Sequence, residues 1–328
     1  MRTVITGGAG FLGARLAIRL LEAAGTPQDP ADSRRVIVAD RPGTALPALL
    51  SERGDDRLEL AEVDLTGPPE ELDALVDGAD AVVHLASVVS ADAEADPDRA
   101  WRVNVDGGRA LLRACAGRAP GCRLLVASSV AVFAGGSGPS GDETKPRPQS
   151  TYGMTKAVLE LLVNEATRRG EIDGRVARLP TVTVRPGRPN LAASSFASGV
   201  FREPLAGVDC VVPVEEGVTL VLIGAHTAVA GLDALLRVPA DRLGPDRGVN
   251  LPGLCVTVEQ MISAARTVGT RRGLRLGAIA VRPDPAIQAI VGSWPARWDA
   301  RQALALGLPA DGSLEAVIER YLDDLPAC

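Results

Sequence analysis

The chain has 328 residues, a length typical of about two domains. Of these residues, 46% are hydrophobic and 23% charged, as in ordinary globular proteins. This composition excludes disorder, collagen and coiled coil as descriptions of the whole chain. Acidic residues outnumber basic ones by 41 to 35 and only 3% are aromatic, so nothing indicates a basic nucleic-acid surface or base-stacking platforms.

The chain start and the cysteines predict a cytoplasmic protein. The first predicted strand begins at Arg2, which leaves no room for a signal peptide. No apolar run approaches the roughly 18 residues of a membrane helix. Five cysteines, at 115, 122, 210, 255 and 328, include no Cys-x-x-Cys pair, which favours reduced thiols. With only two histidines, we expect no metal, and neither nucleic acid nor membrane as a partner.

The first 185 residues alternate short apolar runs with longer helical patterns. Strands are predicted over 2–6, 35–39, 58–63, 81–86, 124–132 and 176–184, and the longest helices over 98–118 and 152–169. Near-continuous apolar strands separated by helices are typical of a parallel sheet that is covered on both faces. We therefore expect an α/β fold with a Rossmann-type doubly wound parallel sheet.

Beyond Pro186 the pattern becomes irregular, and proline and glycine interrupt it repeatedly. Helices are predicted over 257–268, where Thr257 and Gln260 have capping-box spacing, and over 313–325. We expect residues 1–185 to form the nucleotide-binding domain. Residues 186–328 are expected to form a smaller α+β substrate-binding lobe, with some chain crossing back. The ligand cleft should lie at the carboxyl ends of the strands, between the lobes.

The first strand leads into the turn Gly7-Gly8-Ala9-Gly10-Phe11-Leu12-Gly13, which opens the first helix. Gly7 permits the tight turn, Gly10 lets backbone amides approach a pyrophosphate, and Gly13 lets the helix pack closely on the strand. The phosphates would meet the helix N-terminus, where free N–H groups and the helix dipole favour negative charge. The turn therefore predicts binding of a dinucleotide.

Acidic residues at the ends of the next two strands bear on the choice of dinucleotide. Asp40 can accept hydrogen bonds from both ribose hydroxyls and repels a 2′-phosphate, which favours NAD over NADP. Arg41 can pair with that phosphate, so NADP stays open. Asp64 and Leu65 are expected beside the adenine.

Tyr152 and Lys156 are four residues apart on a predicted helix, hence on one face, and Ser129 closes an apolar strand. This set resembles the active site of the short-chain dehydrogenases/reductases, and the glycine-rich turn is similar to that of their extended form. The resemblance implies that Ser129 orients the substrate oxygen, with Ser128 as the alternative, and that Lys156 holds the nicotinamide ribose. Asn104 matches the superfamily's helix asparagine, as a structural residue or a member of a proton relay.

Tyr152 is expected to act as the general base. Its ordinary pKa of about 10 must fall to about 7, which requires roughly 4 kcal/mol of preference for the phenolate. The ammonium of Lys156 and the positive nicotinamide ring are expected to supply it.

A more specific resemblance lies in the segments 84–94, 178–190, 192–196, 202–205 and around Trp294. These segments look like those of the D-erythronate dehydrogenase family, which are NAD-dependent oxidoreductases of four-carbon sugar acids, often grouped with nucleotide-sugar epimerases. The resemblance covers essentially the whole chain. It implies oxidation at the hydroxyl next to the carboxylate, and a homodimer built on the helices 98–118 and 152–169.

Two sets of ligand contacts are expected. The cofactor contacts are Gly7, Gly10, Phe11, Leu12, Gly13, Asp40, Asp64, Leu65, Leu85, Ala86, Ser87, Asn104, Tyr152, Lys156, Pro180 and Thr181. A sugar acid needs a cationic partner for its carboxylate, and Arg185, Arg188 and Arg202 are available, unless they pair with structural carboxylates. Ser90, Ser129 and Asn190 are expected to bind the substrate's hydroxyls.

The chain departs from the family pattern at 219–223, where Thr-Leu-Val-Leu-Ile replaces polar and aromatic residues. If this segment lines the pocket, the enzyme prefers a less polar substrate. His226, just beyond, is expected to be a surface or capping residue.

The sequence therefore predicts an NAD-dependent dehydrogenase that acts on a small hydroxy acid. The alternative is a nucleotide-sugar epimerase, which uses the same Ser–Tyr–Lys set and retains its NAD. A dehydratase is disfavoured because Val130 and Ala131 follow Ser129 in place of an acidic pair. A cofactor-binding scaffold without activity is disfavoured because Tyr152 and Lys156 are both present.

Overall fold

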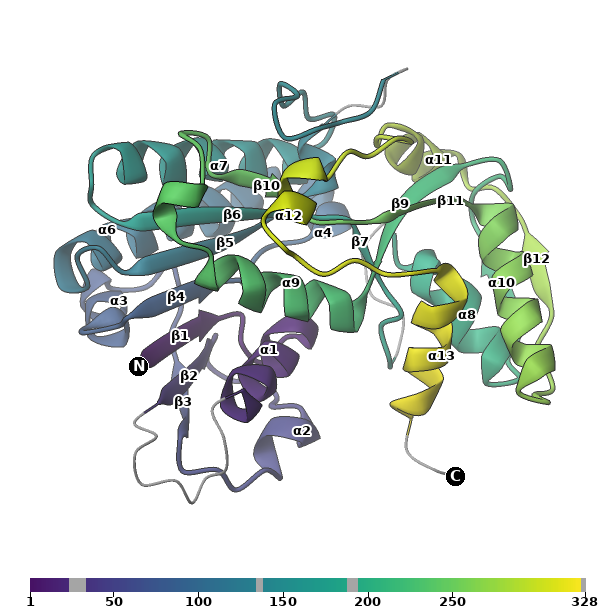
Figure 1. The fold of residues 1–328 in the computed structure, drawn as a ribbon, viewed down its shortest axis with the longest axis horizontal. Coiled ribbons are helices and arrows are strands. Elements are labelled where there is room, and N and C mark those ends of the chain that lie inside the picture. The colour runs from purple at the N-terminus through teal and green to yellow at the C-terminus, as the bar shows by residue number, and fades with distance from the viewer. Residues whose placement is uncertain (24–33, 134–137, 188–193, 326–328) are drawn as a thin grey trace.

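The computed structural model describes residues 1–23, 34–133, 138–187 and 194–325. Its centre is a seven-stranded sheet in the order β10-β6-β5-β4-β1-β2-β3, in which all neighbouring strands are parallel (Figure 1). The strands are β1 (Arg2–Thr6), β2 (Arg35–Asp40), β3 (Leu58–Glu62), β4 (Ala81–His84), β5 (Arg123–Ser129), β6 (Asp173–Leu179) and β10 (Gly248–Asn250). This sheet confirms the predicted Rossmann-type fold. Its strand order reverses at β1, which has β2 on one side and β4 on the other, and ligands bind at such a point in open α/β sheets.

Helices cover both faces of this sheet because its strands are apolar on both faces. Val83 and Leu125 pack on one face against α1 (Phe11–Glu22) and α9 (Ala225–Arg237). Val82 and Leu124 pack on the other face, against α3 (Pro69–Val76), α6 (Gly108–Arg118) and α7 (Thr151–Arg168). The carboxyl ends of the strands are left uncovered by these layers, and both pockets described below open there.

The remaining elements are short helices within the connections of the large sheet, together with a second, smaller group of strands and helices. They are α2 (Ala48–Ser51), α4 (Ser90–Ala95), α5 (Pro97–Ala100), β7 (Thr181–Thr183), α8 (Phe196–Leu205), β8 (Cys210–Val212), β9 (Thr219–Gly224), β11 (Leu254–Thr257), α10 (Val258–Arg271), β12 (Ile279–Val281), α11 (Pro285–Gly292), α12 (Arg301–Ala305) and α13 (Leu314–Asp323). Strands β7, β9 and β11 make one small sheet and β8 with β12 another. A separate apolar core lies between these strands and α8, α10 and α13, on the right of Figure 1.

Three predicted elements differ from the structure. The strand predicted over 176–184 is divided at Pro180 into β6 and β7, which belong to different sheets, because a proline has no N–H with which to continue the ladder. The strand predicted over 124–132 ends at Ser129, after which Val130–Val132 form a 3₁₀ turn. The helix predicted over 98–118 consists of α5, a π-helical stretch Trp101–Gly107 and α6.

The chain also returns from the second group to the first. Strand β10 pairs with β6 and adds the last strand to the large sheet, and α9 packs on α1. The capping box predicted at Thr257 and Gln260 is present at the start of α10. Among the described residues, no helix is both long and apolar enough to cross a membrane.

Candidate active site

Two pockets open side by side at the carboxyl ends of the strands and share Gly7, Gly10, Leu85, Ser87 and Val89 as walls. The first, called here the nucleotide pocket, has a volume of about 530 Å³ and is also lined by Asp40, Arg41, Asp64, Leu65, Thr66, Ala86, Arg99 and Arg102. The second, the reaction pocket, has a volume of about 260 Å³ and is also lined by Phe11, Leu12, Gly13, Ser90, Ser129, Tyr152, Lys156, Pro180, Thr181, Arg185 and Trp294. Most of the predicted contacts are therefore brought together.

The glycine-rich turn lies directly against neighbouring backbone. Gly7 has a φ of +71°, and a Cβ on it would be 2.5 Å from the nitrogen of Ala86. A Cβ on Gly13 would be 2.4 Å from the carbonyl oxygen of Gly7. Helix α1 begins after Gly10 without a side-chain cap, which leaves N–H groups of its first turn to face the pocket. A turn of this shape fits a pyrophosphate.

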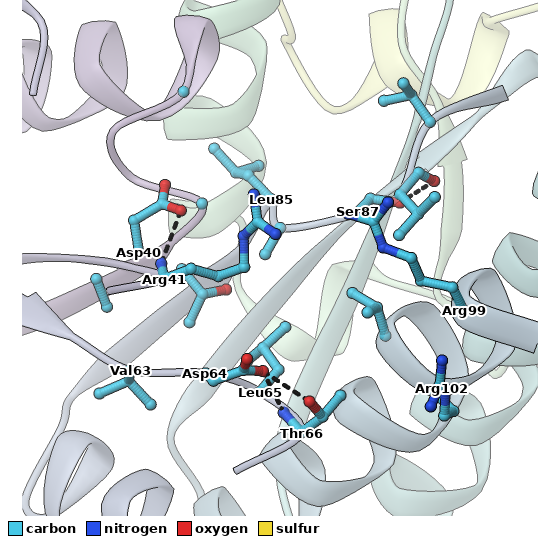
Figure 2. Close-up of a pocket in the computed structure, with 18 of the residues that line it drawn as sticks. Asp40, Arg41, Val63, Asp64, Leu65, Thr66, Leu85, Ser87, Arg99 and Arg102 are labelled. Atoms are coloured by element: carbon cyan, nitrogen blue, oxygen red, sulfur yellow. Dashed lines mark hydrogen bonds between the residues drawn. The ribbon is translucent and has the colours of Figure 1, made fainter. Parts of the chain in front are cut away.

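The acidic side chains at the strand ends are held in place by backbone N–H groups (Figure 2). Asp40 accepts from Ala9 at 3.2 Å and from Arg41 at 2.9 Å. Asp64 accepts from both the backbone N–H and the hydroxyl of Thr66 at 2.8 Å, and these bonds lower its pKa. Asp40 thus presents a fixed carboxylate at the pocket edge. The carboxylate of Asp64 instead accepts the hydrogen bonds of the turn that follows it, and Leu65 supplies an apolar wall of the pocket.

Two arginines that the sequence analysis did not single out also line the nucleotide pocket. Arg99 from α5 and Arg102 from the π-helical stretch border it on the side of Ser87 (Figure 2). Both fall in a predicted helix, where a charged residue is most simply read as facing solvent. A Pro97 at the first helical position, capped by Asp96, was the available signal that a helix begins there and points its first turns at the site.

Asn104 lies behind the pockets. Its side-chain oxygen accepts from Val88 N at 2.7 Å and from the Ser87 hydroxyl at 3.1 Å, and its amide donates to Val88 O and to Thr155 Oγ1. It is 1% exposed and lines neither pocket. Its bonds therefore anchor the segment after β4 to α7, which is the structural reading of this residue.

Ser129, Tyr152 and Lys156 meet in the reaction pocket because β5 ends beside the first turns of α7. The Lys156 Nζ donates to Ala127 O at 2.9 Å and lies 5.7 Å from the centre of the Tyr152 ring. A hydrogen bond joins Tyr152 to the Ser129 side chain. The Ser128 hydroxyl points to the other side of β5 and donates to Glu160. Ser129, rather than Ser128, is thus the serine beside the tyrosine.

The ionisation of this set differs in part from the expectation. Burial lowers the pKa of Lys156 to about 8, and the negative charge of Glu160 acts against this. Burial raises the pKa of Tyr152, whereas the bond with Ser129 and the positive charge of Arg185 act to lower it. In the protein alone, burial therefore outweighs the positive charge of Arg185 on Tyr152. The expected effect of Lys156 and of the nicotinamide ring on this pKa stays a prediction.

Arg185 is the predicted carboxylate-binding residue that reaches the reaction pocket. Its guanidinium stacks 5.9 Å from the centre of the Phe11 ring and has no acceptor among the described residues. Burial lowers its pKa. A half-buried arginine without a protein partner is available to a ligand's carboxylate.

Two predictions about the substrate end are corrected. Arg202 does not line the pocket. Its guanidinium donates to Arg185 O at 2.8 Å and to the carboxylate of its neighbour on α8, Glu203. The segment 219–223 is the buried strand β9, paired with β7 and β11, and is not part of the pocket wall. Its aliphatic residues therefore give no reason to expect a less polar substrate. Arg188 and Asn190 lie outside the described residues.

His226 lies away from this centre. It is on the first turn of α9 and forms a hydrogen bond through Nε2 with the carboxylate of Asp324. Both residues line a different cavity, which also involves Arg15 and Asp311. The expectation of a surface residue agrees with this position.

Comparisons with known proteins agree with this geometry. Residues 3–216 match the model of the NAD dependent epimerase/dehydratase family. The chain is 44% identical to D-erythronate dehydrogenase of Cupriavidus necator, over 99% of this chain and 98% of the relative. It is 41% identical to D-erythronate dehydrogenase of Haemophilus influenzae, over 98% and 99%. A solved nucleoside-diphosphate-sugar epimerase from Agrobacterium tumefaciens superposes with a TM-score of 0.87 and 33% identity, over 99% of this chain and 94% of that one. The chain therefore belongs to the NAD dependent epimerase/dehydratase family, as its sequence resemblance predicted, and NAD is its cofactor.

Proposed function

We propose that the protein oxidises D-erythronate, or a closely related hydroxy acid, at the hydroxyl next to the carboxylate. The observation that carries this proposal is the reaction pocket, in which Ser129 and Tyr152 lie with Arg185, whose guanidinium has no hydrogen-bond acceptor among the described residues. The substrate itself is suggested by the two D-erythronate dehydrogenases to which the chain is similar over nearly its whole length.

Each residue of the pocket has a role in this proposal. The guanidinium of Arg185 grips the substrate carboxylate, and the Ser129 hydroxyl orients the substrate oxygen by hydrogen bonding. Tyr152 Oη takes the hydroxyl proton as the base. NAD, when bound, accepts the hydride from the carbon that carries this hydroxyl. The glycine-rich turn from Gly7 to Gly13 and the Asp40 carboxylate would hold the cofactor.

The size of the reaction pocket favours a small acid over a nucleotide sugar. Its volume of about 260 Å³ lies below the roughly 300–1,000 Å³ of pockets that enclose drug-sized ligands. The described walls are apolar around Phe11, Leu12 and Trp294, so binding energy is concentrated in the few polar contacts. A four-carbon acid with one charge matches this distribution.

The experiment is an assay of NADH formation with purified protein, NAD and a panel of aldonic acids, uronic acids and less polar hydroxy acids. Tyr152→Phe is the blank, and NADP is run in parallel. Turnover with D-erythronate or a close analogue supports the proposal. Turnover with less polar alcohols alone contradicts the substrate. No turnover on any acid, together with tightly bound NAD in the preparation, favours the nucleotide-sugar epimerase.

We infer that the protein is a homodimer that pairs through α6 and α7. Leu161 on α7 is 68% exposed and Trp101, at the start of the π-helical stretch before α6, is 42% exposed. Exposed apolar side chains on a helical face are typical of an interface. Leu161→Arg should give a monomer in sedimentation, whereas the matched control Leu304→Arg, on α12 and 54% exposed, should leave the assembly unchanged.

We also propose that the protein works in the cytoplasm. Cys115, Cys122, Cys210 and Cys255 are free thiols, and the first three are buried. Free thiols are typical of proteins in a reducing compartment. Fractionation of the producing cells tests this proposal.

A further inference from the structure

A buried carboxylate lies one helical turn beyond Lys156. Glu160 is on the same face of α7 as Lys156, is 3% exposed and lines neither pocket. Arg178 Nη2 donates to it at 2.7 Å, and Arg178 Nε donates at 3.0 and 3.1 Å. The Ser128 hydroxyl donates to the same carboxylate. Glu160 therefore has a fixed position and an ionic partner, and it contacts the reaction pocket only through Ser128, which lines that pocket.

The partners of Glu160 connect it to the residues that do line the reaction pocket. Ser128 precedes Ser129 on β5, and Arg178 on β6 is paired in register with Ser128. The Lys156 Nζ donates to the carbonyl of Ala127, directly before Ser128. The carboxylate is thus bonded to the strand end that carries Ser129, and the backbone of the same strand end accepts the hydrogen bond from the ammonium of Lys156.

The negative charge of Glu160 matters because Lys156 is buried. Burial removes water from the ammonium and lowers the pKa of Lys156 to about 8, close to the pH at which the enzyme would work. The Glu160 carboxylate acts in the opposite direction. Arg178, 1% exposed, offsets part of the carboxylate's charge. The protonation of Lys156 therefore depends on the balance between two buried residues that never meet the substrate.

We propose that Glu160 is a positioning residue of the reaction: it keeps Lys156 in its charged form and holds the Ser129 strand end against α7, while Arg178 limits its charge. The proposal rests on the proposed function and on the role expected for Lys156 from the sequence, which is to hold the nicotinamide ribose and favour the Tyr152 phenolate, but the ionisation of this lysine is measurable without turnover. Glu160 would then set the upper pH limit of the enzyme.

Other ionisable groups surround Lys156. Tyr152 lies on the same helix and His84 on β4, and Arg185 follows β7. Glu94 of α4 accepts from Thr151 N at 2.6 Å, at the beginning of α7. The imidazole of His84 is neutral near pH 7, because burial first and Lys156 second lower its pKa to about 3. Within the described part of the chain, Glu160 is the charged group that acts on Lys156.

The composition of the chain permits a direct test. Lys145 and Lys156 are its only lysines, and Lys145 is exposed. In protein labelled with ¹³C-lysine, a pH titration by NMR therefore follows two side chains, and Lys145→Arg identifies the signal of Lys156. The same titration is carried out on Glu160→Gln, Arg178→Met and Ser128→Ala.

The two charge-removing variants should move the titration midpoint of Lys156 in opposite directions. Glu160→Gln removes the negative charge and should lower the midpoint by about one pH unit or more, whereas Arg178→Met removes the positive charge and should raise it. Ser128→Ala, which removes a bond to Glu160 but no charge, should leave the midpoint in place. Across these variants, the alkaline limb of the pH–rate profile for NADH formation should move with the titration midpoint of Lys156. Glu160→Asp, which keeps the negative charge, should give a midpoint close to that of the wild type.

The outcomes separate this inference from the proposed function. Opposite midpoint shifts without turnover on any hydroxy acid would support the role of Glu160 and contradict the substrate. An unchanged midpoint in a Glu160→Gln protein that unfolds as cooperatively as the wild type would overturn the inference. If that variant does not fold, the double variant Glu160→Gln/Arg178→Met, which removes both members of the buried Glu160–Arg178 pair, replaces it. The inference would also be overturned by two results together. The titration midpoint of Lys156 in the double variant would equal that of the wild type, and Arg178→Met alone would not raise this midpoint.

Discussion

Gly13→Ala tests whether close packing in the glycine-rich turn is what binds NAD. The added Cβ would be 2.4 Å from Gly7 O and 2.6 Å from Gly8 Cα. Ordinary van der Waals contact of a Cβ begins at 3.4 Å, so the added Cβ and the Gly7 carbonyl oxygen have to move apart by about 1.0 Å. Both neighbours are backbone atoms of the turn itself, and no side chain can rotate away. The strain must therefore displace the N–H groups that face the pocket.

Overpacking of this kind costs about 1–3 kcal/mol, which corresponds to about a 5- to 100-fold loss of NAD affinity at 1.4 kcal/mol per factor of ten. Alanine also favours a helix over glycine by about 1 kcal/mol, so thermal stability should fall less than affinity does. Titration calorimetry with NAD and thermal unfolding without it measure the two effects separately.

The matched control is the same substitution at Gly117, in the last turn of α6, where a Cβ would meet nothing within 4 Å. Gly117→Ala should stabilise the protein by up to about 1 kcal/mol and leave NAD affinity unchanged. Wild-type affinity in Gly13→Ala, at wild-type stability, would refute the packing argument.

Three further predictions concern charge and protonation. Tyr152→Phe should abolish NADH formation and leave NAD affinity within about twofold, as calorimetry can show, because only the base is lost. Arg185→Ala should lower kcat/KM for a hydroxy acid by about 10- to 100-fold through the lost charged hydrogen bonds. It should also move the acid limb of the pH–rate profile upward, since Arg185 acts to lower the pKa of Tyr152; a limb that stays in place would contradict that effect. The bond with Arg57 holds the pKa of Asp55 at about 2, so this carboxylate stabilises the fold above its unfolded pKa near 4 and ceases to do so as the pH falls through 2. Asp55→Asn should cost about 2 kcal/mol at pH 7 and little below pH 2, as urea unfolding at the two pH values would show.

The nucleotide end of the protein was predictable because its signals are local in sequence. The glycines at 7, 10 and 13, and Asp40 at a strand end, are each defined by neighbours within a few residues, and the structure places them around one pocket. Tyr152 and Lys156 were also locally readable, since helical spacing alone puts them on one face. Their meeting with Ser129 follows once β5 and β6, which α7 connects in the chain, are parallel neighbours in the sheet.

The substrate end was less predictable because its residues come together only in three dimensions. Nothing local distinguishes Arg185, whose side chain reaches the pocket and stacks on Phe11, from Arg202, whose side chain donates to the backbone of Arg185. The apolar run at 219–223 indicates burial, but the sequence does not say whether a pocket or a sheet buries it. The opposing effects of burial and charge on Tyr152 likewise depend on packing that no motif encodes.

The break at Pro180 has a consequence for how such an enzyme can change its substrate in evolution. Upstream of it, β5 and β6 belong to the sheet that carries the glycine-rich turn and the base, whereas Thr181 and Arg185 belong to a segment that pairs with the small sheet. Replacements in the short segment from Thr181 to Arg185 can therefore reshape the reaction pocket without altering a strand of the large sheet. One peptide link separates the part of the molecule that determines the reaction from the part that selects the molecule it acts on.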